Sequence, residues 1–120
     1  MIQLNSQNAR KLSALGLIKK AGALVAGTEL SEKSVKSGKS ALVLIASDVS
    51  ERTAKRMLDA CAYYKTEVRI SEFTMDEIST AIGLVRPTAA ISITRREFLK
   101  LVESENRSAN NGGISCQKKE

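Results

Sequence analysis

The segment Ala41-Leu42-Val43-Leu44-Ile45-Ala46 is a continuous run of six apolar residues. A strand with one face in solvent alternates apolar and polar residues, whereas a strand covered on both faces is apolar throughout. The run therefore predicts a strand inside a sheet that has helices on both sides, which is the architecture of α/β proteins.

Helix and strand patterns alternate before this run. Ser6 is expected to cap a first helix that Gly22 ends, because serine side chains accept hydrogen bonds from helix N–H groups and glycine commonly follows a last turn. Residues 24–26 predict a short strand. Thr28 is expected to cap a second helix, which Gly38 closes.

A third helix follows the central run, with Asp48 and Ser50 as alternative caps. Its apolar residues recur at intervals of three and four, which is the spacing of one helix face. These residues are Ala54, Met57, Leu58 and Cys61. Residues 68–70 then predict another strand.

Two capping boxes mark further helix starts, Thr74-Met75-Asp76-Glu77 and Thr94-Arg95-Arg96-Glu97. In such a box the threonine and glutamate side chains each accept a hydrogen bond from the backbone of the helix start. Between the boxes, residues 89–93 predict a strand. The helix after the second box is expected to bury three apolar side chains, Phe98, Leu101 and Val102.

Five helices interleaved with four strands predict a three-layer α/β/α sandwich around a four-stranded mixed sheet. The 120 residues suffice for one hydrophobic core. We expect a single domain over residues 1–104. We also expect a disordered tail over residues 105–120, because this segment consists largely of polar residues and glycine with little to bury.

The composition argues against several classes of enzyme. The chain has no histidine, which removes most acid–base, Ser-His-Asp and zinc-hydrolase chemistry. Gly38-Lys39-Ser40 resembles the end of a phosphate-binding loop, but Lys33 stands where that loop needs its first glycine. Cys61 and Cys116 make no disulfide framework. We expect a non-enzymatic protein with no cofactor and no metal.

Neither a membrane span nor a secretory leader is visible in the sequence. No apolar stretch reaches the roughly 18 residues that a spanning helix needs. The first residues also lack the basic-then-apolar order of a signal peptide. We therefore expect a cytoplasmic protein that does not bind membranes.

The chain carries a net charge of +6, and the charge is unevenly distributed. Residues 1–40 hold seven Lys or Arg against two Glu, residues 41–80 five against seven Asp or Glu, and residues 81–120 seven against four. If the basic ends meet in the fold, they form one positive face suited to nucleic acid. The alternative is a solvated surface with excess lysine. Only four aromatic residues occur, which argues against a platform of stacked bases.

The segment Gly27-Thr28-Glu29-Leu30-Ser31-Glu32-Lys33 places a glycine and a helix start on this basic chain. Free N–H groups at a helix N-terminus bind anions, and the helix dipole favours negative charge there. The commonest large anion that a basic protein binds is nucleic acid. The segment therefore predicts a corner that docks RNA or DNA.

A second candidate is the loop Gly83-Leu84-Val85-Arg86-Pro87-Thr88. Proline restricts its backbone, and an apolar pair beside a cation can hold an unstacked base and its phosphate. The alternative is structural: Gly83 ends a helix in the left-handed conformation, and Leu84 and Val85 are tucked into the core.

The ordered succession of four segments resembles a known family. These segments are Leu15–Gly22, Gly27–Glu29, Leu42–Ser50 and Ala81–Gly83. The family is that of the kink-turn-binding ribosomal proteins, the large-subunit protein "seven-Ae" and its "thirty-e" relatives, and in particular its short bacterial YlxQ-like members. The resemblance covers residues 4 to about 103.

The resemblance implies an α/β/α sandwich that grips a kink-turn, a sharply bent RNA duplex with sheared G·A pairs beside a bulge. It implies that the second helix enters the major groove with its N-terminus, where Gly27 admits the backbone and Lys33 reaches a guanine edge or a phosphate. It also implies that the second loop packs on a flipped-out nucleotide. The residues carried over are Gly27, Thr28, Glu29, Leu30, Lys33, Leu84, Val85, Arg86 and Pro87, and Lys36 adds to the positive field. We expect a monomer bound to structured RNA, such as a kink-turn in ribosomal RNA.

The sequence departs from the family at its RNA-reading positions. Glu29 stands where the family has asparagine, and Leu30 stands where it has glutamate. Val25-Ala26 replaces a lysine pair. One bidentate base contact contributes about 1–3 kcal/mol of discrimination, so we expect weaker or differently tuned recognition of kink-turns. The alternative function is a protein-interaction adaptor on the same fold with weak, non-specific RNA binding.

Overall fold

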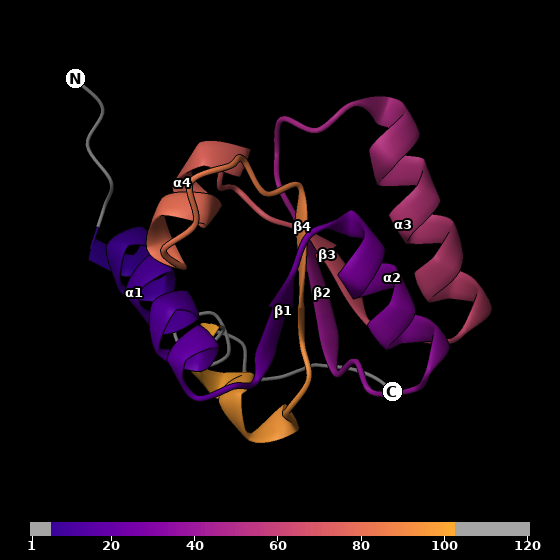
Figure 1. Ribbon diagram of the computed structural model, residues 1–120, viewed down its shortest axis with the longest axis horizontal. Coiled ribbons are helices and arrows are strands. Elements are labelled where there is room, and N and C mark those ends of the chain that lie inside the picture. Colours follow the sequence, from indigo (N-terminus) through magenta and orange to yellow (C-terminus); the bar gives the residue numbers. More distant parts are fainter. Residues whose placement is uncertain (1–5, 103–120) are drawn as a thin grey trace, which may run out of the picture.

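The apolar run at residues 41–46 forms an inner strand of a mixed four-stranded sheet in the computed structural model, which describes residues 6–102 (Figure 1). The strand order is β1 (Leu24–Ala26), β4 (Ala90–Ile93), β2 (Leu42–Ile45) and β3 (Val68–Ile70). β2 and β3 are parallel, and β4 is antiparallel to both of its neighbours. The predicted mixed sheet is confirmed.

Helices cover both faces of this sheet. α1 (Ser6–Lys20) and α4 (Met75–Ala81) lie on one side, and α2 (Thr28–Lys36) and α3 (Glu51–Tyr63) lie on the other (Figure 1). A short 3₁₀ helix, η1 (Arg96–Phe98), follows β4. The three-layer α/β/α sandwich predicted from the sequence is therefore confirmed.

Two clusters of buried side chains hold the layers together, one on each face of the sheet. Alternate residues of β2 enter the two clusters: Leu42 and Leu44 join the α1 and α4 side, and Val43 and Ile45 join the α2 and α3 side. All four are at most 7% exposed, which explains why this strand has no polar position. Burial of each such side chain stabilises the fold by about 1.5–3 kcal/mol.

Several predicted helix ends are confirmed. Gly22 and Gly38 follow α1 and α2 in the left-handed conformation, each with φ +77°. At the start of α4 both bonds of the first capping box form. The Glu77 amide donates to Thr74 Oγ1 at 3.1 Å, and the Thr74 amide donates to Glu77 Oε1 at 2.9 Å.

The two candidate caps of the third helix have different partners. Ser50 caps α3, since its Oγ accepts a hydrogen bond from the Thr53 amide at 3.1 Å. Asp48 instead accepts the amide of Met75, the first residue of α4, at 2.9 Å. Of the expected apolar face of α3, Met57 and Cys61 are fully buried, and Leu58 lies at its edge with 36% exposure.

The second capping box was a wrong prediction. Residues 96–98 form a 3₁₀ turn with Arg95 at its N-cap and no side-chain cap bond. In a capping box the Glu97 carboxylate would accept a hydrogen bond from a backbone amide. Here it accepts one from Arg95 Nη2 at 2.6 Å instead. Val102 is buried as expected, but Leu101 is 40% exposed. The predicted domain limit at 104 and the predicted tail lie outside the described residues.

Candidate functional site

Gly27 makes the turn between β1 and α2 with a backbone conformation that favours glycine. Its φ is +101° and its ψ is +153°, a region that residues with a side chain rarely enter. Its amide donates to the carbonyl oxygen of Ala90 at 2.8 Å, and its own carbonyl accepts the Ser31 amide at 2.9 Å. A Cβ at this position would meet no atom within 4 Å, so the requirement for glycine is conformational and not steric.

Thr28 is not the cap of α2, contrary to the sequence-based prediction. It is the first residue of the helix, Gly27 holds the cap position, and no side chain supplies a cap bond. Within the described chain, no acceptor is found for the backbone N–H groups of Thr28, Glu29 and Leu30. The helix therefore presents three free donors at the positive end of its dipole.

The loop before β4 ends α4 with a left-handed glycine, as one of the two sequence-based alternatives predicted. Its apolar side chains, however, lie in solvent and not in the core. Gly83 is left-handed, with φ +79°, and its amide and the Leu84 amide bond back to the last turn of α4. Val85 is 98% exposed and Leu84 39% exposed, so the apolar pair is not tucked into the core. Arg86 and Pro87 are exposed as well.

Backbone hydrogen bonds fix the base of this loop beside the start of α2. The Thr88 amide donates to the Met75 carbonyl at 3.3 Å, and the Ala89 carbonyl accepts the Ala46 amide at 2.8 Å. The next carbonyl, that of Ala90, accepts the Gly27 amide. The two segments singled out in the sequence, 27–33 and 83–88, thus meet at one end of the sheet (Figure 1).

Asp48 supports this corner, a role that the sequence reading missed. Its carboxylate holds the first amide of α4, and α4 leads directly into the exposed loop. The signal was present in the sequence, because an acidic residue after a strand is a common helix cap. The sequence did not reveal that the helix in question is α4 instead of the adjacent α3.

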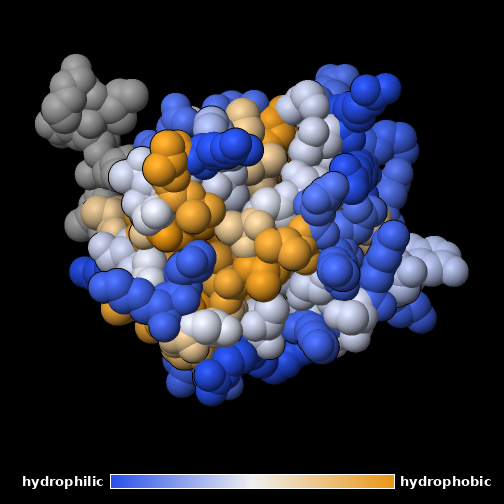
Figure 2. All heavy atoms as spheres, in the orientation of Figure 1, coloured by the Kyte–Doolittle hydropathy of each residue, from blue (hydrophilic) through white to orange (hydrophobic). Residues whose placement is uncertain are grey.

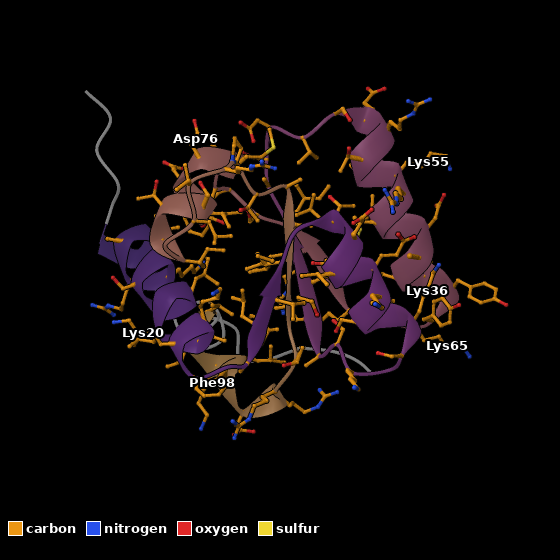
Figure 3. The ribbon with its side chains drawn as sticks, in the orientation of Figure 1. Lys20, Lys36, Lys55, Lys65, Asp76 and Phe98 are labelled. Atoms are coloured by element: carbon orange, nitrogen blue, oxygen red, sulfur yellow. The ribbon has the colours of Figure 1, made fainter. Side chains whose placement is uncertain are left out.

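Both lysines of α2 lie in its last turn, but at different distances from the free amides. Lys33 is exposed and lies four residues after Glu29, so the two share a helix face near the free amides. Lys36 is the last residue of the helix, about 12 Å along the axis from Thr28 at 1.5 Å per residue. Figure 3 shows Lys36 at that far end. Lys33 is therefore closer to the corner than Lys36, and helical side chains tilt toward the N-terminus.

One of the two carboxylates of α2 is neutralised by α3. Arg56 donates from Nε to Glu32 Oε1 at 3.1 Å and also forms a salt bridge through Nη2. This hydrogen bond, with the positive charge of Arg56, lowers the pKa of the Glu32 carboxyl, and the carboxylate in turn raises the pKa of Arg56. Glu29 is the exposed carboxylate that remains in the first turn.

An open groove runs along the edge of the sheet between β1 and α2. Its lining residues are Val25, Leu30, Lys33, Ser34, Ser37, Lys39 and Thr94. Leu30 is 52% exposed there. Figure 2 shows hydrophobic side chains gathered in the middle of the viewed face, over β1. The corner therefore combines free amides and cations with an apolar surface.

Among the described residues, no group of three or more His, Cys, Asp or Glu side chains is placed to hold a metal ion. In the same part of the chain, no helix has the length and apolar character needed to cross a membrane.

Comparison with known proteins identifies relatives over almost the whole described fold. The profile of the ribosomal protein L7Ae/L30e/S12e/Gadd45 family matches residues 10–103. The protein "RNA-binding protein YlxQ" of Enterococcus faecium is 34% identical over 99 residues, which cover 81% of this chain and 92% of that protein. A protein of the same name from Bacillus subtilis (strain 168) is 41% identical over 51 residues, 42% of this chain and 51% of the relative.

Solved structures share the architecture. A protein of unknown function from Bacillus halodurans C superposes with a TM-score of 0.73 at 30% identity, covering 80% of this chain and 95% of that one. The Giardia lamblia 15.5kD RNA binding protein superposes with a TM-score of 0.70 over 90% of both chains. Its identity of 20% supports a likeness of fold alone.

Proposed function

We propose that this chain, which belongs to the ribosomal protein L7Ae/L30e/S12e/Gadd45 family, is a non-enzymatic protein that binds structured RNA of the kink-turn type. The relatives from Enterococcus faecium and Bacillus subtilis are named RNA-binding proteins, which supports an RNA partner. The observation that carries the proposal is the bond from the Gly27 amide to the Ala90 carbonyl. It places three free helix amides beside an exposed loop with apolar and cationic side chains.

The first half of the proposed interface is the start of α2. The amides of Thr28, Glu29 and Leu30 donate to phosphate or base oxygens, and Gly27 leaves room for the RNA backbone because it has no side chain. Lys33 lies on the same helix face and adds a mobile cation. These groups position the RNA and contribute most of the salt-dependent affinity.

The second half is the loop before β4. Leu84, Val85 and Pro87 offer exposed apolar surface on which a nucleotide pulled out of the stack can rest. The exposed guanidinium of Arg86 follows directly and is suited to the phosphate of that nucleotide. The loop therefore recognises a bulge, and the start of α2 recognises the adjacent bent duplex.

Glu29 and Leu30 determine which contacts the start of α2 can make with RNA bases. A glutamate carboxylate accepts hydrogen bonds from base amino and imino groups but donates none, and it repels nearby phosphates. Lys33, one helical turn away, offsets that repulsion. Leu30 offers contact area in place of a hydrogen bond. We therefore propose recognition of kink-turns with fewer base-edge contacts and a larger electrostatic share.

A gel-shift titration tests this function. The wild type is expected to bind a kink-turn duplex more tightly than the same duplex with its G·A pairs changed to G·C. Lys33→Ala is expected to weaken binding and to reduce the slope of log K against log salt by about 0.7–0.9, the value for one phosphate contact. Lys55→Ala removes an equal charge from the outer side of α3 and serves as the control, with little change expected (Figure 3).

A second candidate function is favoured by the apolar surface near the corner. Leu30 and Val85 are 52% and 98% exposed, and such surface is typical of protein interfaces. On this reading the chain is an adaptor that binds RNA weakly and without specificity. Equal, weak binding to both duplexes would favour the adaptor and overturn the kink-turn proposal.

Two further properties belong to the first proposal. A structured RNA partner such as ribosomal RNA places the protein in the cytoplasm, and the site needs residues of one chain only, so we propose a monomer. Size-exclusion chromatography with light scattering at several concentrations measures the second property. A concentration-independent mass of about 13 kDa is expected from the composition.

A further inference from the structure

The end of α3 carries two exposed aromatic side chains that the site described above does not use. Tyr63 is 79% exposed and Tyr64 is 42% exposed. Their ring centroids are 4.8 Å apart and the rings are inclined by 74°, an edge-to-face contact. They are the only tyrosines of the chain and half of its four aromatic residues. Tyrosine is enriched at interfaces, because its ring is apolar and its hydroxyl is polar.

A lysine follows the pair where a glycine would ordinarily stand. Lys65 has φ +57°, the only non-glycine residue with positive φ among the described residues. Its amide donates to the Ala62 carbonyl, and the Thr66 amide donates to the Cys61 carbonyl at 2.8 Å, which is how a left-handed residue ends a helix. Glycine adopts this conformation without strain. Lysine there places a cationic residue next to Tyr64 in the chain.

A second lysine lies at the same end of this helical layer. Figure 3 shows Lys36 and Lys65 where α2 and α3 both finish. In the described part of the chain neither lysine makes a salt bridge, whereas Lys55 pairs with Asp59 at 3.0 Å in the middle of α3. The tyrosine pair therefore lies at the end of the layer where positive charge is not neutralised by an ion pair.

We propose that Tyr63, Tyr64, Lys65 and Lys36, together the tyrosine patch, form a second RNA contact that binds unpaired nucleotides. The rings stack on bases, and the ammonium groups bind the phosphates between them. This is the chemistry of single-strand binding, which needs an aromatic face and nearby cations and no sequence-specific hydrogen bond. The inference rests on the proposed RNA-binding function and extends it to the single strand that flanks the structured element.

The dimensions of α2 suit this arrangement. The patch lies at the end of α2 opposite to the free amides, about 12 Å away along the helix axis. At about 3.4 Å per stacked nucleotide, that distance corresponds to about four nucleotides. A strand that leaves a duplex docked at Gly27 reaches the patch after a short single-stranded segment. The patch is too small for the extended platform that the low aromatic content already argued against.

Intrinsic fluorescence tests the contact directly. The chain has no tryptophan, so its ultraviolet emission comes only from the tyrosine patch. Single-stranded oligouridine of eight nucleotides is expected to quench this emission in a saturable way, because a stacked base quenches tyrosine. A blunt kink-turn duplex is expected to bind without this quenching. Absence of quenching by oligouridine overturns the proposal, as does quenching by the blunt duplex of equal size.

Affinity measurements separate the patch from the corner. A kink-turn duplex with an eight-nucleotide single-stranded extension is expected to bind the wild type about fivefold more tightly than the blunt duplex. The double variant Tyr63→Ala/Tyr64→Ala is expected to lose this gain and keep the blunt-duplex affinity. Tyr63→Phe retains a ring and is expected to keep the gain. Leu17→Ala, which trims an exposed apolar side chain of α1, is the matched control and should behave as the wild type.

The outcomes distinguish the two proposals. If the double variant keeps the full gain, or if Tyr63→Phe loses it, the patch does not stack on RNA. If the wild type fails to prefer the kink-turn duplex but oligouridine still quenches the tyrosines, the kink-turn proposal fails and the patch stands. A tyrosine signal that responds to a protein and to no RNA identifies the patch as a protein-binding surface and overturns the inference.

Discussion

Replacing Gly27 by alanine tests whether the turn into α2 depends on glycine. The residue has φ +101° and ψ +153°, a conformation that costs other residues about 1–3 kcal/mol. The space around its Cβ position is empty, so no steric term adds to this cost. Alanine also lowers the conformational entropy of the unfolded chain, which offsets about 0.4–1 kcal/mol of this cost. We expect Gly27→Ala to lower the free energy of unfolding by about 1–2 kcal/mol.

The second expected effect of this variant is on binding. If alanine relaxes the turn, the Gly27 amide moves away from the Ala90 carbonyl and the free amides of α2 turn away from the loop before β4. RNA affinity should then fall. Gly22→Ala is the matched control, since Gly22 is also left-handed, with φ +77°, but follows α1 away from this corner. It is expected to lower stability and leave RNA affinity unchanged.

Urea unfolding followed by circular dichroism measures the first effect, and a fluorescence-anisotropy titration of labelled RNA measures the second. A small domain typically has about 5–15 kcal/mol of stability, so Gly27→Ala stays folded during the binding assay. An unchanged urea midpoint with an unchanged slope would show that the turn tolerates alanine. The same affinity for Gly27→Ala as for the wild type would show that the turn does not position the RNA-binding amides.

Three further substitutions follow from the contacts. Gly16→Ala should lower the thermal midpoint, because its Cβ would lie 2.7 Å from the backbone carbonyl oxygen of Ala81 and would push α1 from α4, a change that typically costs about 1–3 kcal/mol. Asp48→Ala removes the acceptor of the first amide of α4 and should cost about 1 kcal/mol in urea unfolding, and an unaltered midpoint would contradict that role. Arg56→Ala should destabilise the protein at neutral pH only. The folded pKa of Glu32 is depressed, so this stabilisation is present above its ordinary value of 4.5 and is lost as the pH falls through the lower folded value, which paired unfolding curves at pH 7 and pH 3 would measure.

Local sequence signals predicted most of the elements correctly. The six-residue apolar run, the glycines after α1 and α2 and the first capping box each depend on a few adjacent residues, and all are confirmed. The failures also have local causes. Threonine is a common helix cap, so the sequence predicts Thr28 at that position, but Gly27, with its unusual backbone angles, holds the cap one residue earlier. The box at Thr94 failed because Arg95 binds Glu97.

The candidate site depended on information that local patterns do not contain. Residues 27–33 and 83–88 lie far apart in the sequence, and nothing in their periodicity says that they meet. They meet because β4 inserts beside β1 and brings Ala90 to Gly27. Only the resemblance to a known family indicated, from the sequence, that both segments belong to one site. Similarly, the exposure of Tyr63 and of Val85 follows from where α3 and α4 end in three dimensions.

The order of the strands also bears on how the protein matures during synthesis. β4 is the last described strand in the chain, yet it lies between β1 and β2 in the sheet (Figure 1). Until the ribosome has released residues 90–93, the two flanking strands have no common neighbour and Gly27 has no carbonyl to anchor it. The corner at Gly27 is therefore completed late in synthesis, once β4 has paired with both β1 and β2.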